Sequence, residues 1–181
     1  MMLGATNIEK AAVLELLLQN RIATEKCLTI DYNFNGMIVS TGMIELSVAD
    51  SDFFMVFSIP QKCSKNIFFA ISENSYKIAS LCVAYCEYCT YGHQADFGEN
   101  ISFDTVEIDE LKHIKNILLL SIHDSLVLES YDDDFMISDK IYQAHLCLPC
   151  FEDDMPILAN FNIHDVLLEF EKKGKDFMIF E

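Results

Sequence analysis

Hydrophobic and polar residues alternate over much of the middle of the chain, and this period of two predicts β-strands. CLTIDYNF (27–34) shows the alternation, and an Asn-Gly dipeptide typical of a tight turn separates it from MIVSTGMIELSV (37–48). DFFMVFSIP (52–60) has the continuous apolar character of a buried strand and ends at a proline. We therefore expect a hairpin followed by a third strand.

Three other segments have apolar residues at the three- and four-residue spacing of an amphipathic helix. ATNIEKAAVLELLLQN, within residues 1–25, begins with Thr6 and Glu9 at the spacing of a capping box. A second helix is predicted from an N-cap at Asn74 to about Tyr88. Its expected apolar face consists of Ile78, Leu81, Cys82, Tyr85 and Cys89.

The third helix is predicted in NIHDVLLEFEKKG, with Asn162 as its N-cap, lysines in its last turn and Gly174 as the residue that ends it. The loop YGHQADFGEN precedes segments that favour strands, namely ISFDTVEI, KNILLLSIHDSLVLES, FMIS and IYQAHLCLP. Strands dominate the middle of the chain and helices occur at intervals. This order predicts an α+β fold, with a mixed, largely antiparallel β-sheet flanked by helices, in one compact domain spanning residues 1–181.

The acidic residues are concentrated in the second half of the chain. The formal net charge is −17, with nine acidic against six basic residues in 1–90 and 20 acidic against six basic residues in 91–181. Two clusters stand out, Asp132, Asp133 and Asp134 in YDDDF and Glu152, Asp153 and Asp154 in FEDDM. A field of this sign repels nucleic acid and anionic membranes and attracts a basic protein. We predict that these six carboxylates contact a basic partner; the alternative is a solvated rim that only aids solubility.

The chain has the features of a cytoplasmic protein. No apolar run reaches the ~18 residues that a membrane span needs. The N-terminal segment has no basic leader of the kind found in signal peptides. Seven cysteines are an odd number, which disfavours a disulfide framework and favours free thiols.

The sequence contains no recognisable catalytic motif. A phosphate-binding loop, a dinucleotide fingerprint, a nucleophile elbow and an HExxH zinc motif are all missing from the sequence. None of the five histidines, His93, His113, His123, His145 and His164, lies in a recognisable acid–base or nucleophile context. We therefore predict a protein that is not an enzyme and that has no catalytic residues and no cofactor.

Two CxxC pairs, CEYC (86–89) and CLPC (147–150), raise the possibility of a zinc site. The pairs are separated by 57 residues, and one lies late in a predicted helix while the other ends a predicted strand. Free cysteine is also among the most buried residue types. Core packing is the favoured interpretation, so no metal is predicted, and a zinc protein or enzyme using His93 and the cysteines is the alternative.

The segment GMIVSTGMIELSV (36–48) resembles the LVTSGMSEL signature of the suppressor-of-fused-like domain family. Further segments resemble those of the family in the same order, and they are DSDFFMVFSIP, SENSYKIASLCVAYCEY, TYGHQADFGENISF, IYQAHLCLPCFEDD and NIHDVLLEFEKKGKDFMIF. The likeness covers residues 28–181. The chain departs from the family pattern at Ile44, Tyr91 and Gln94, so the resemblance is to a divergent, small bacterial-type member.

The resemblance implies structural roles for the residues that match the family motifs. They are Thr41, Gly42, Met43 and Glu45 in the signature, Gly92 and His93 in the loop, and Gly174 after the last helix. We expect Gly42 to allow a backbone bend with positive φ and Met43 to lie in the core. His93 is expected to hold its loop in place, and the alternative is contact with a ligand.

The resemblance also implies a binding function. The animal member of the family holds a transcription factor inactive by clamping a short peptide, and small bacterial members are proposed as immunity proteins that neutralise toxins. We therefore predict a non-catalytic protein-binding domain, an immunity or antidote protein for a basic toxin or another basic protein partner. The alternative is a regulatory adaptor that binds a linear peptide by strand addition at a sheet edge. The oligomeric state stays open.

Overall fold

A computed structural model of the protein describes residues 27–48, 51–73, 75–122, 134–137 and 139–180. Several predicted features lie outside these residues. They are the helix within residues 1–25 with Thr6 and Glu9, the N-cap Asn74, the histidine His123, and the carboxylates Asp132 and Asp133.

The sheet begins with the predicted hairpin. Strand β1 (Cys27–Phe34) pairs with β2 (Met37–Val48) in antiparallel register. Asn35 and Gly36 connect them with φ values of 52° and 87°, the left-handed conformation that a two-residue hairpin turn requires. Strand β3 (Ser51–Ile59) then pairs antiparallel with β2, so the three predicted strands are confirmed.

The centre of the sheet is a strand that the hydrophobic pattern did not single out. Strand β4 (Asn66–Ser72) is buried at every one of its seven residues. It pairs antiparallel with β3 and parallel with β8 (Lys140–Cys150). Because both faces of β4 are covered, its sequence, NIFFAIS, shows no alternation of apolar and polar residues.

The remaining strands complete one mixed sheet of eight described strands. Its order is β1-β2-β3-β4-β8-β6-β5, with β5 (Asn100–Ser102) and β6 (Asn116–Leu120) at one side, and β7 (Asp134–Ile137) paired to β8. Only the β4–β8 pair is parallel among these strands. The predicted α+β class with a largely antiparallel sheet is therefore confirmed. The predicted strand ISFDTVEI was too long, because the chain turns after β5 and forms the short 3-10 helix η1 (Asp109–Leu111).

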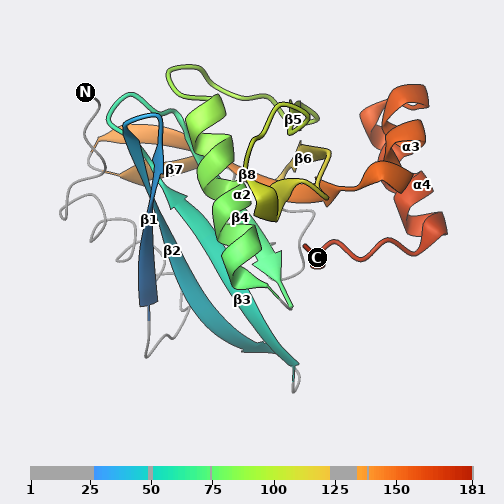
Figure 1. The fold of residues 1–181 in the computed structure, drawn as a ribbon, viewed down its shortest axis with the longest axis horizontal. Coiled ribbons are helices and arrows are strands. Elements are labelled where there is room, and N and C mark those ends of the chain that lie inside the picture. Colours follow the sequence, from blue (N-terminus) through green and yellow to red (C-terminus); the bar gives the residue numbers. More distant parts are fainter. Residues whose placement is uncertain (1–26, 49–50, 74, 123–133, 138, 181) are drawn as a thin grey trace.

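Helix α2 (Tyr76–Cys89) lies across β2, β3 and β4 on one face of the sheet (Figure 1). Its N-cap is Ser75, one residue after the predicted Asn74, because the Ser75 hydroxyl accepts a hydrogen bond from the backbone N–H of Ile78. The apolar residues that the helix buries completely are Ala79, Cys82, Val83, Ala84 and Cys86, and Ser80 and Glu87 are buried with them. The predicted apolar face was therefore wrong in part, since Leu81 and Tyr85 lie at its border and Cys89 is exposed.

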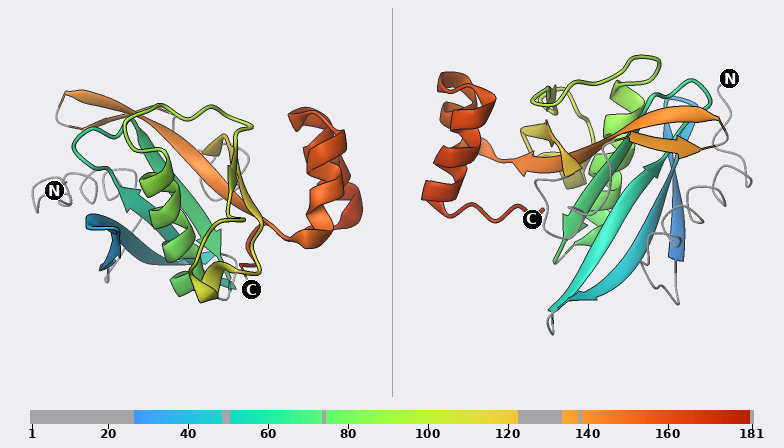
Figure 2. Two further views of the ribbon diagram at one scale, coloured as in Figure 1. Left: turned by 45° about the horizontal axis from the view of Figure 1, so that its top comes forward. Right: turned by 180° about the vertical axis from the view of Figure 1, so that it is seen from behind.

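The C-terminal helices lie at the far end of β8, well away from β1 (Figures 1 and 2). A 3-10 turn, η3 (Glu152–Asp154), leads into α3 (Met155–Asn160) and α4 (Ile163–Lys173). Asn162 caps α4 and Gly174 ends it with φ 70°, both as predicted, whereas α3 was not expected. Val166 and Phe170 of α4 pack into the core on the face of the sheet opposite α2.

Candidate functional site

Strand β7 and the start of β8 form a two-stranded ribbon (Figure 1). Two of its apolar side chains are exposed to solvent. Met136 and Ile141 are directly opposite each other in the register and are 66% and 65% exposed. Asp134, also exposed, is opposite Gln143 in the same way. Because residues two apart on a strand share a face, these four side chains form one continuous surface.

The loop after α2 extends this surface along β8. The side-chain amide of Gln94 donates a hydrogen bond to Oε1 of Gln143 at 2.9 Å. Phe97 is 41% exposed, and its ring lies 5.1 Å from that of His145, which follows Gln143 on the same face of the strand. We call the six residues Gln94, Phe97, Asp134, Met136, Ile141 and Gln143 the ribbon face.

The side chain of the buried residue Asn66 forms hydrogen bonds with the backbone of this loop. The amide of Asn66 donates to the carbonyl oxygen of His93 at 2.9 Å, and its Oδ1 accepts from the backbone N–H of Ala95 at 3.0 Å. Gly92 turns the chain with φ 83°. The imidazole of His93 points to solvent, with Nε2 3.7 Å from Glu99. The loop is therefore held through the carbonyl group of His93, and the expected role of its side chain stays a prediction.

Of the first predicted acidic cluster the structure describes Asp134, which lies beside the start of β8, whereas Glu152, Asp153 and Asp154 follow its end. Glu152 and Asp153 are exposed, and Glu152 forms an ion pair of 3.5 Å with Lys115. Glu152 comes nine positions after Gln143, which is opposite Asp134, and an extended chain of that length spans roughly 30 Å. The structure therefore brings Asp134 to the ribbon face and leaves Glu152 and Asp153 far from it.

Asp154 requires a correction, because it is not an exposed carboxylate. Its side chain is 5% exposed and pairs with Lys175 at 2.7 Å and Lys173 at 3.3 Å. It also accepts the backbone N–H of Phe151 at 2.9 Å. Burial acts to raise the pKa of Asp154, but the bonds from Lys175 and Phe151 outweigh it and the pKa is lowered. Asp154 joins the end of β8 to the chain after α4.

Three of the four signature residues on β2 are buried, namely Thr41, Gly42 and Met43, and Gly42 does not have the backbone conformation that was expected. Thr41 is buried, and its hydroxyl is 2.6 Å from that of Ser80 on α2. Gly42 does not have positive φ; a Cβ there would lie 2.2 Å from the ring of Phe57, so the close approach of that ring requires a glycine. Met43 is in the core beneath α2, as expected, and Glu45 is exposed.

The CxxC cysteines are split between opposite sides of the sheet. Cys86 and Cys147 lie with Cys82 in the core beneath α2, whereas Cys150 is in the core of the other face and Cys89 is exposed. Residues three apart on a strand point in opposite directions, which explains why Cys147 and Cys150 cannot share a ligand. Burial raises the pKa of Cys82 and Cys86, so these thiols stay protonated. In the described part of the chain, no group of three or more His, Cys, Asp or Glu side chains could hold a metal ion.

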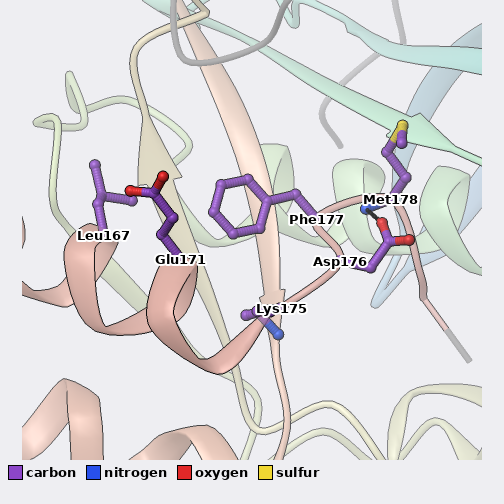
Figure 3. A pocket seen from close by; sticks show the side chains of 7 residues that line it. Leu167, Glu171, Lys175, Asp176, Phe177 and Met178 are labelled. Carbon is purple, nitrogen blue, oxygen red and sulfur yellow. Dashed lines mark hydrogen bonds between the residues drawn. The ribbon is translucent and has the colours of Figure 1, made fainter.

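A pocket of about 640 Å³ lies between α4 and the segment that follows it. Figure 3 shows Phe177 between Glu171 of α4 and Asp176. Asp176 accepts the backbone N–H of Met178 at 2.8 Å, so its carboxylate stabilises a turn in this segment. A small-molecule site requires polar groups that converge on one point, and the polar groups of this pocket do not.

The sequence analysis missed the exposed apolar members of the ribbon face. Met136 and Ile141 occur in short segments, FMIS and KIYQ, whose alternation predicts a strand without saying which face is covered. One weak signal of exposure was available in the sequence, because Met136 and Ile141 lie close to the charged residues Asp134 and Lys140.

Two solved structures share this arrangement of strands and helices. One is a SUFU (suppressor of fused protein) homolog from Neisseria gonorrhoeae, with a TM-score of 0.64 and 11% identity, covering 98% of this chain and 96% of that chain. The other is a chain of the Sufu–Fu complex, with a TM-score of 0.57 and 14% identity, covering 93% of this chain and 87% of that chain. The chain has the suppressor-of-fused fold.

The suppressor-of-fused likeness predicted from the sequence is therefore confirmed for the fold. No protein-family model matches the chain, and no curated protein matches its sequence. Within the suppressor-of-fused fold, the signature lies on β2, the loop motif follows α2, and the last motif forms α4. None of the helices in the described residues combines the length and the hydrophobicity that crossing a membrane requires.

Proposed function

We propose that this chain is a non-catalytic, cytoplasmic protein-binding domain, a divergent and small bacterial-type member of the suppressor-of-fused-like family. One domain spans residues 1–181, and it acts as an immunity or antidote protein that neutralises a basic toxin. The observation that carries the proposal is the ribbon face, where an exposed apolar pair lies beside a carboxylate on a strand whose outer edge pairs with none of the described strands. The Sufu–Fu complex is an instance of this fold with a protein partner.

The ribbon face has the composition of a small protein-binding surface. Met136 and Ile141 are large side chains with about two thirds of their surface in water, and covering them with a partner would release that water. Asp134 is at the border of the pair, and Asp132 and Asp133 precede it in the chain. In this proposal the apolar pair supplies affinity, and the carboxylates speed association with a basic partner.

The second acidic cluster is a separate candidate contact. Glu152 and Asp153 are exposed at the far end of β8, so one partner reaching both ends would have to cover roughly 30 Å. Asp154 is buried in ion pairs with Lys173 and Lys175 and is not proposed as a contact. Substitutions at Asp134 and at Asp153 therefore test two different surfaces.

The edge of β7 favours a second candidate function, an adaptor that binds a linear peptide. Among the described strands, β7 pairs with β8 and with no other. Its outer edge can accept a further strand through backbone hydrogen bonds, and Met136 would then contact the added strand. The two candidates differ in the partner, a folded toxin or a short extended segment.

The cysteine and histidine environments support a non-catalytic role. Burial raises the pKa of Cys82 and Cys86 and raises that of Cys150 to about 12, and protonated thiols are weak nucleophiles. His145 is enclosed and contacts Asn66, while His113 contacts the backbone carbonyl of Phe180. These contacts are those of residues that stabilise the fold.

The test is capture of partners from the source organism by the wild-type chain and by matched variants. Ile141→Lys disrupts the apolar pair, and Leu168→Lys is its control, because Leu168 is an exposed apolar residue on α4. Asp134→Lys and Asp153→Lys make the same charge change at the two ends of β8. A captured protein is then expressed with and without the chain, to measure whether the chain suppresses its toxicity.

We expect a basic, toxic protein that Ile141→Lys and Asp134→Lys fail to retain and that the control retains. Rising salt should weaken capture, because it screens the carboxylates. Retention by Ile141→Lys together with loss by Asp153→Lys would move the site to the other end of β8. Binding that survives unfolding of the captured protein would favour the peptide adaptor over the antidote.

A further inference from the structure

A second surface, distinct from the ribbon face, is a groove lined by aromatic rings. It has a volume of about 520 Å³ and lies between the β1–β2 hairpin, α2 and residues 105–108. Tyr32, Phe34, Tyr85 and Tyr88 contribute their rings to its lining. Phe34 is at the centre of this group, with its ring centroid 5.6 Å from that of Tyr85 and 5.2 Å from that of Tyr88.

Hydrogen bonds and ring contacts hold these aromatic side chains in place. The amide of Asn35, in the hairpin turn, donates to the hydroxyl of Tyr88 at 3.1 Å. The hydroxyl of Tyr32 donates to Ser80 at 3.0 Å, and the ring of Tyr85 packs edge-on against Phe103. The groove is therefore formed before any ligand arrives, which lowers the entropy cost of binding.

The charge of the groove favours a cation. Glu107 is exposed. Of the described residues that line the groove, Glu107 alone carries a charge. The faces of aromatic rings are electron-rich and attract cations. Burial raises the pKa of Tyr85 to about 12, so its hydroxyl stays neutral near pH 7. Rings beside a single carboxylate form a site for one positive charge attached to an apolar or planar group.

Among protein cations, the guanidinium group of arginine fits these surfaces better than the ammonium of lysine. It is planar, so it stacks on aromatic rings, and it is more weakly hydrated than an ammonium group. It can also donate two hydrogen bonds to one carboxylate. Lysine carries a compact, strongly hydrated charge that keeps more of its water.

We propose that the groove binds an arginine side chain of a basic protein partner, stacked on the half-buried rings of Tyr85 and Tyr88, which pack on the buried ring of Phe34, and paired with Glu107. This assignment rests on the proposed function only for the source of the arginine. The chemistry of the groove can be tested without any natural partner. The net charge of −17 would draw such a side chain toward this surface as well as toward the ribbon face.

The test is an NMR titration of the full chain with capped tripeptides, Gly-Arg-Gly, Gly-citrulline-Gly and Gly-Lys-Gly. Citrulline has nearly the shape of arginine without its charge. Tetramethylammonium is a fourth probe, which distinguishes a guanidinium site from a cage for quaternary ammonium. The variants are Tyr88→Leu and Glu107→Gln. Glu110→Gln is the matched control, because Glu110 is an exposed acid near Glu107 that does not line the groove.

We expect saturable shifts at the resonances of Phe34 and Tyr85 with the arginine peptide and weaker binding of the other three probes. Tyr88→Leu and Glu107→Gln should each weaken arginine binding about fivefold, and Glu110→Gln should leave it unchanged. Equal binding of the citrulline peptide, tighter binding of tetramethylammonium, or no shift at these rings would overturn the proposal. Failure of the titration would leave capture by the ribbon face unaffected, so the two proposals can fail separately.

Discussion

At Gly42 the packing of one ring determines which residue the sheet can hold. A Cβ at this position would lie 2.2 Å from Cζ and 2.5 Å from Cε2 of Phe57, its cross-strand partner on β3. Phe57 is completely buried, so the ring has little room to move. The glycine of the family signature is thus explained by a side-chain contact rather than by its backbone angles.

We predict that Gly42→Ala lowers the free energy of unfolding by about 1–3 kcal/mol, the usual cost of overpacking a core. Urea unfolding measures it. Phe57→Leu is the informative second change, because it removes the ring that the new methyl group would meet. If Gly42→Ala costs as much in the Phe57→Leu background as in the wild type, this contact is not the reason for the glycine.

Glu87 is a buried carboxylate without a cationic partner among the described residues. Its Oε1 accepts the backbone N–H of Gln61 and its Oε2 accepts the hydroxyl of Ser64, both at 3.0 Å. The other titratable groups near it are Tyr91 and, beside Tyr91, Cys63. Burial raises the pKa of Glu87 from 4.5 to about 7, although both hydrogen bonds act to lower it.

A raised pKa means that the folded state binds this proton more tightly than the unfolded state. The stabilisation is therefore fully present below about pH 4.5 and is lost as the pH rises through about 7. The loss amounts to about 3 kcal/mol at 1.36 kcal/mol for each pKa unit. We predict that Glu87→Gln lacks this loss, so the variant gains stability relative to the wild type as the pH rises.

Urea unfolding at about pH 5 and about pH 8 measures this difference, and effects of all other groups cancel between the two proteins. Glu45→Gln is the control, because Glu45 is exposed on β2 and should not change the pH dependence. Parallel pH profiles for the wild type and Glu87→Gln would show that Glu87 is ionised in the folded protein at neutral pH.

At the scale of elements, local signals predicted what local forces determine. The β1–β2 hairpin followed from its Asn-Gly turn, and the ends of α4 followed from Asn162 and Gly174. Strand β4 did not, because a strand covered on both faces has no alternation to detect. The buried face of α2 differs from the predicted one, because Ala79 and Val83 are buried where Ile78 and Tyr85 were expected. The smaller side chains allow the helix to approach the sheet more closely.

The chain after α4 is fastened to the end of β8 by a buried ion pair. Lys175 is 6% exposed, lies 2.7 Å from Asp154, and has its ammonium group over the rings of Phe151 and Phe170. Further along, Phe180 is completely buried and its carbonyl oxygen is 2.6 Å from Nε2 of His113. This short C-terminal segment is therefore part of the fold and positions α4 against the sheet.

We predict that Lys175→Met destabilises the protein by about 3 kcal/mol, because it leaves the buried carboxylate of Asp154 with Lys173 as its one cationic partner among the described residues. Thermal and urea unfolding measure the loss. Lys172→Met should have no measurable effect, since Lys172 forms its ion pair with Glu169 in solvent. The double variant Asp154→Asn, Lys175→Met should cost less than the sum of the single changes; strict additivity would contradict the pairing.

At the scale of the whole molecule, the acidic residues can be read from the sequence, but their positions relative to one another in the fold cannot. Asp134 and Glu152 belong to two acidic clusters that look equivalent in the sequence, yet these two residues lie near opposite ends of β8. Asp154 follows Asp153 in the same cluster, and the fold turns one inward and leaves the other in solvent. Such differences depend on pairing between distant segments, which no local pattern records.

The net charge of −17 also determines whether copies of this chain stay apart. The ribbon face and the edge of β7 are surfaces on which two copies could associate, and at neutral pH mutual repulsion opposes that contact. The repulsion vanishes near the isoelectric point, about pH 4.4. We predict that the protein is monomeric at neutral pH and low salt and self-associates as the pH approaches about 4.4.

Light scattering across this pH range measures association, with circular dichroism to establish that the fold persists. Ile141→Lys and Leu168→Lys change the net charge equally, but only the first alters the ribbon face. We therefore expect Ile141→Lys to suppress association strongly and Leu168→Lys to do little more than shift the pH at which it begins. Equal behaviour of the two variants would show that net charge alone controls association and that the ribbon face has no special affinity for a second protein surface.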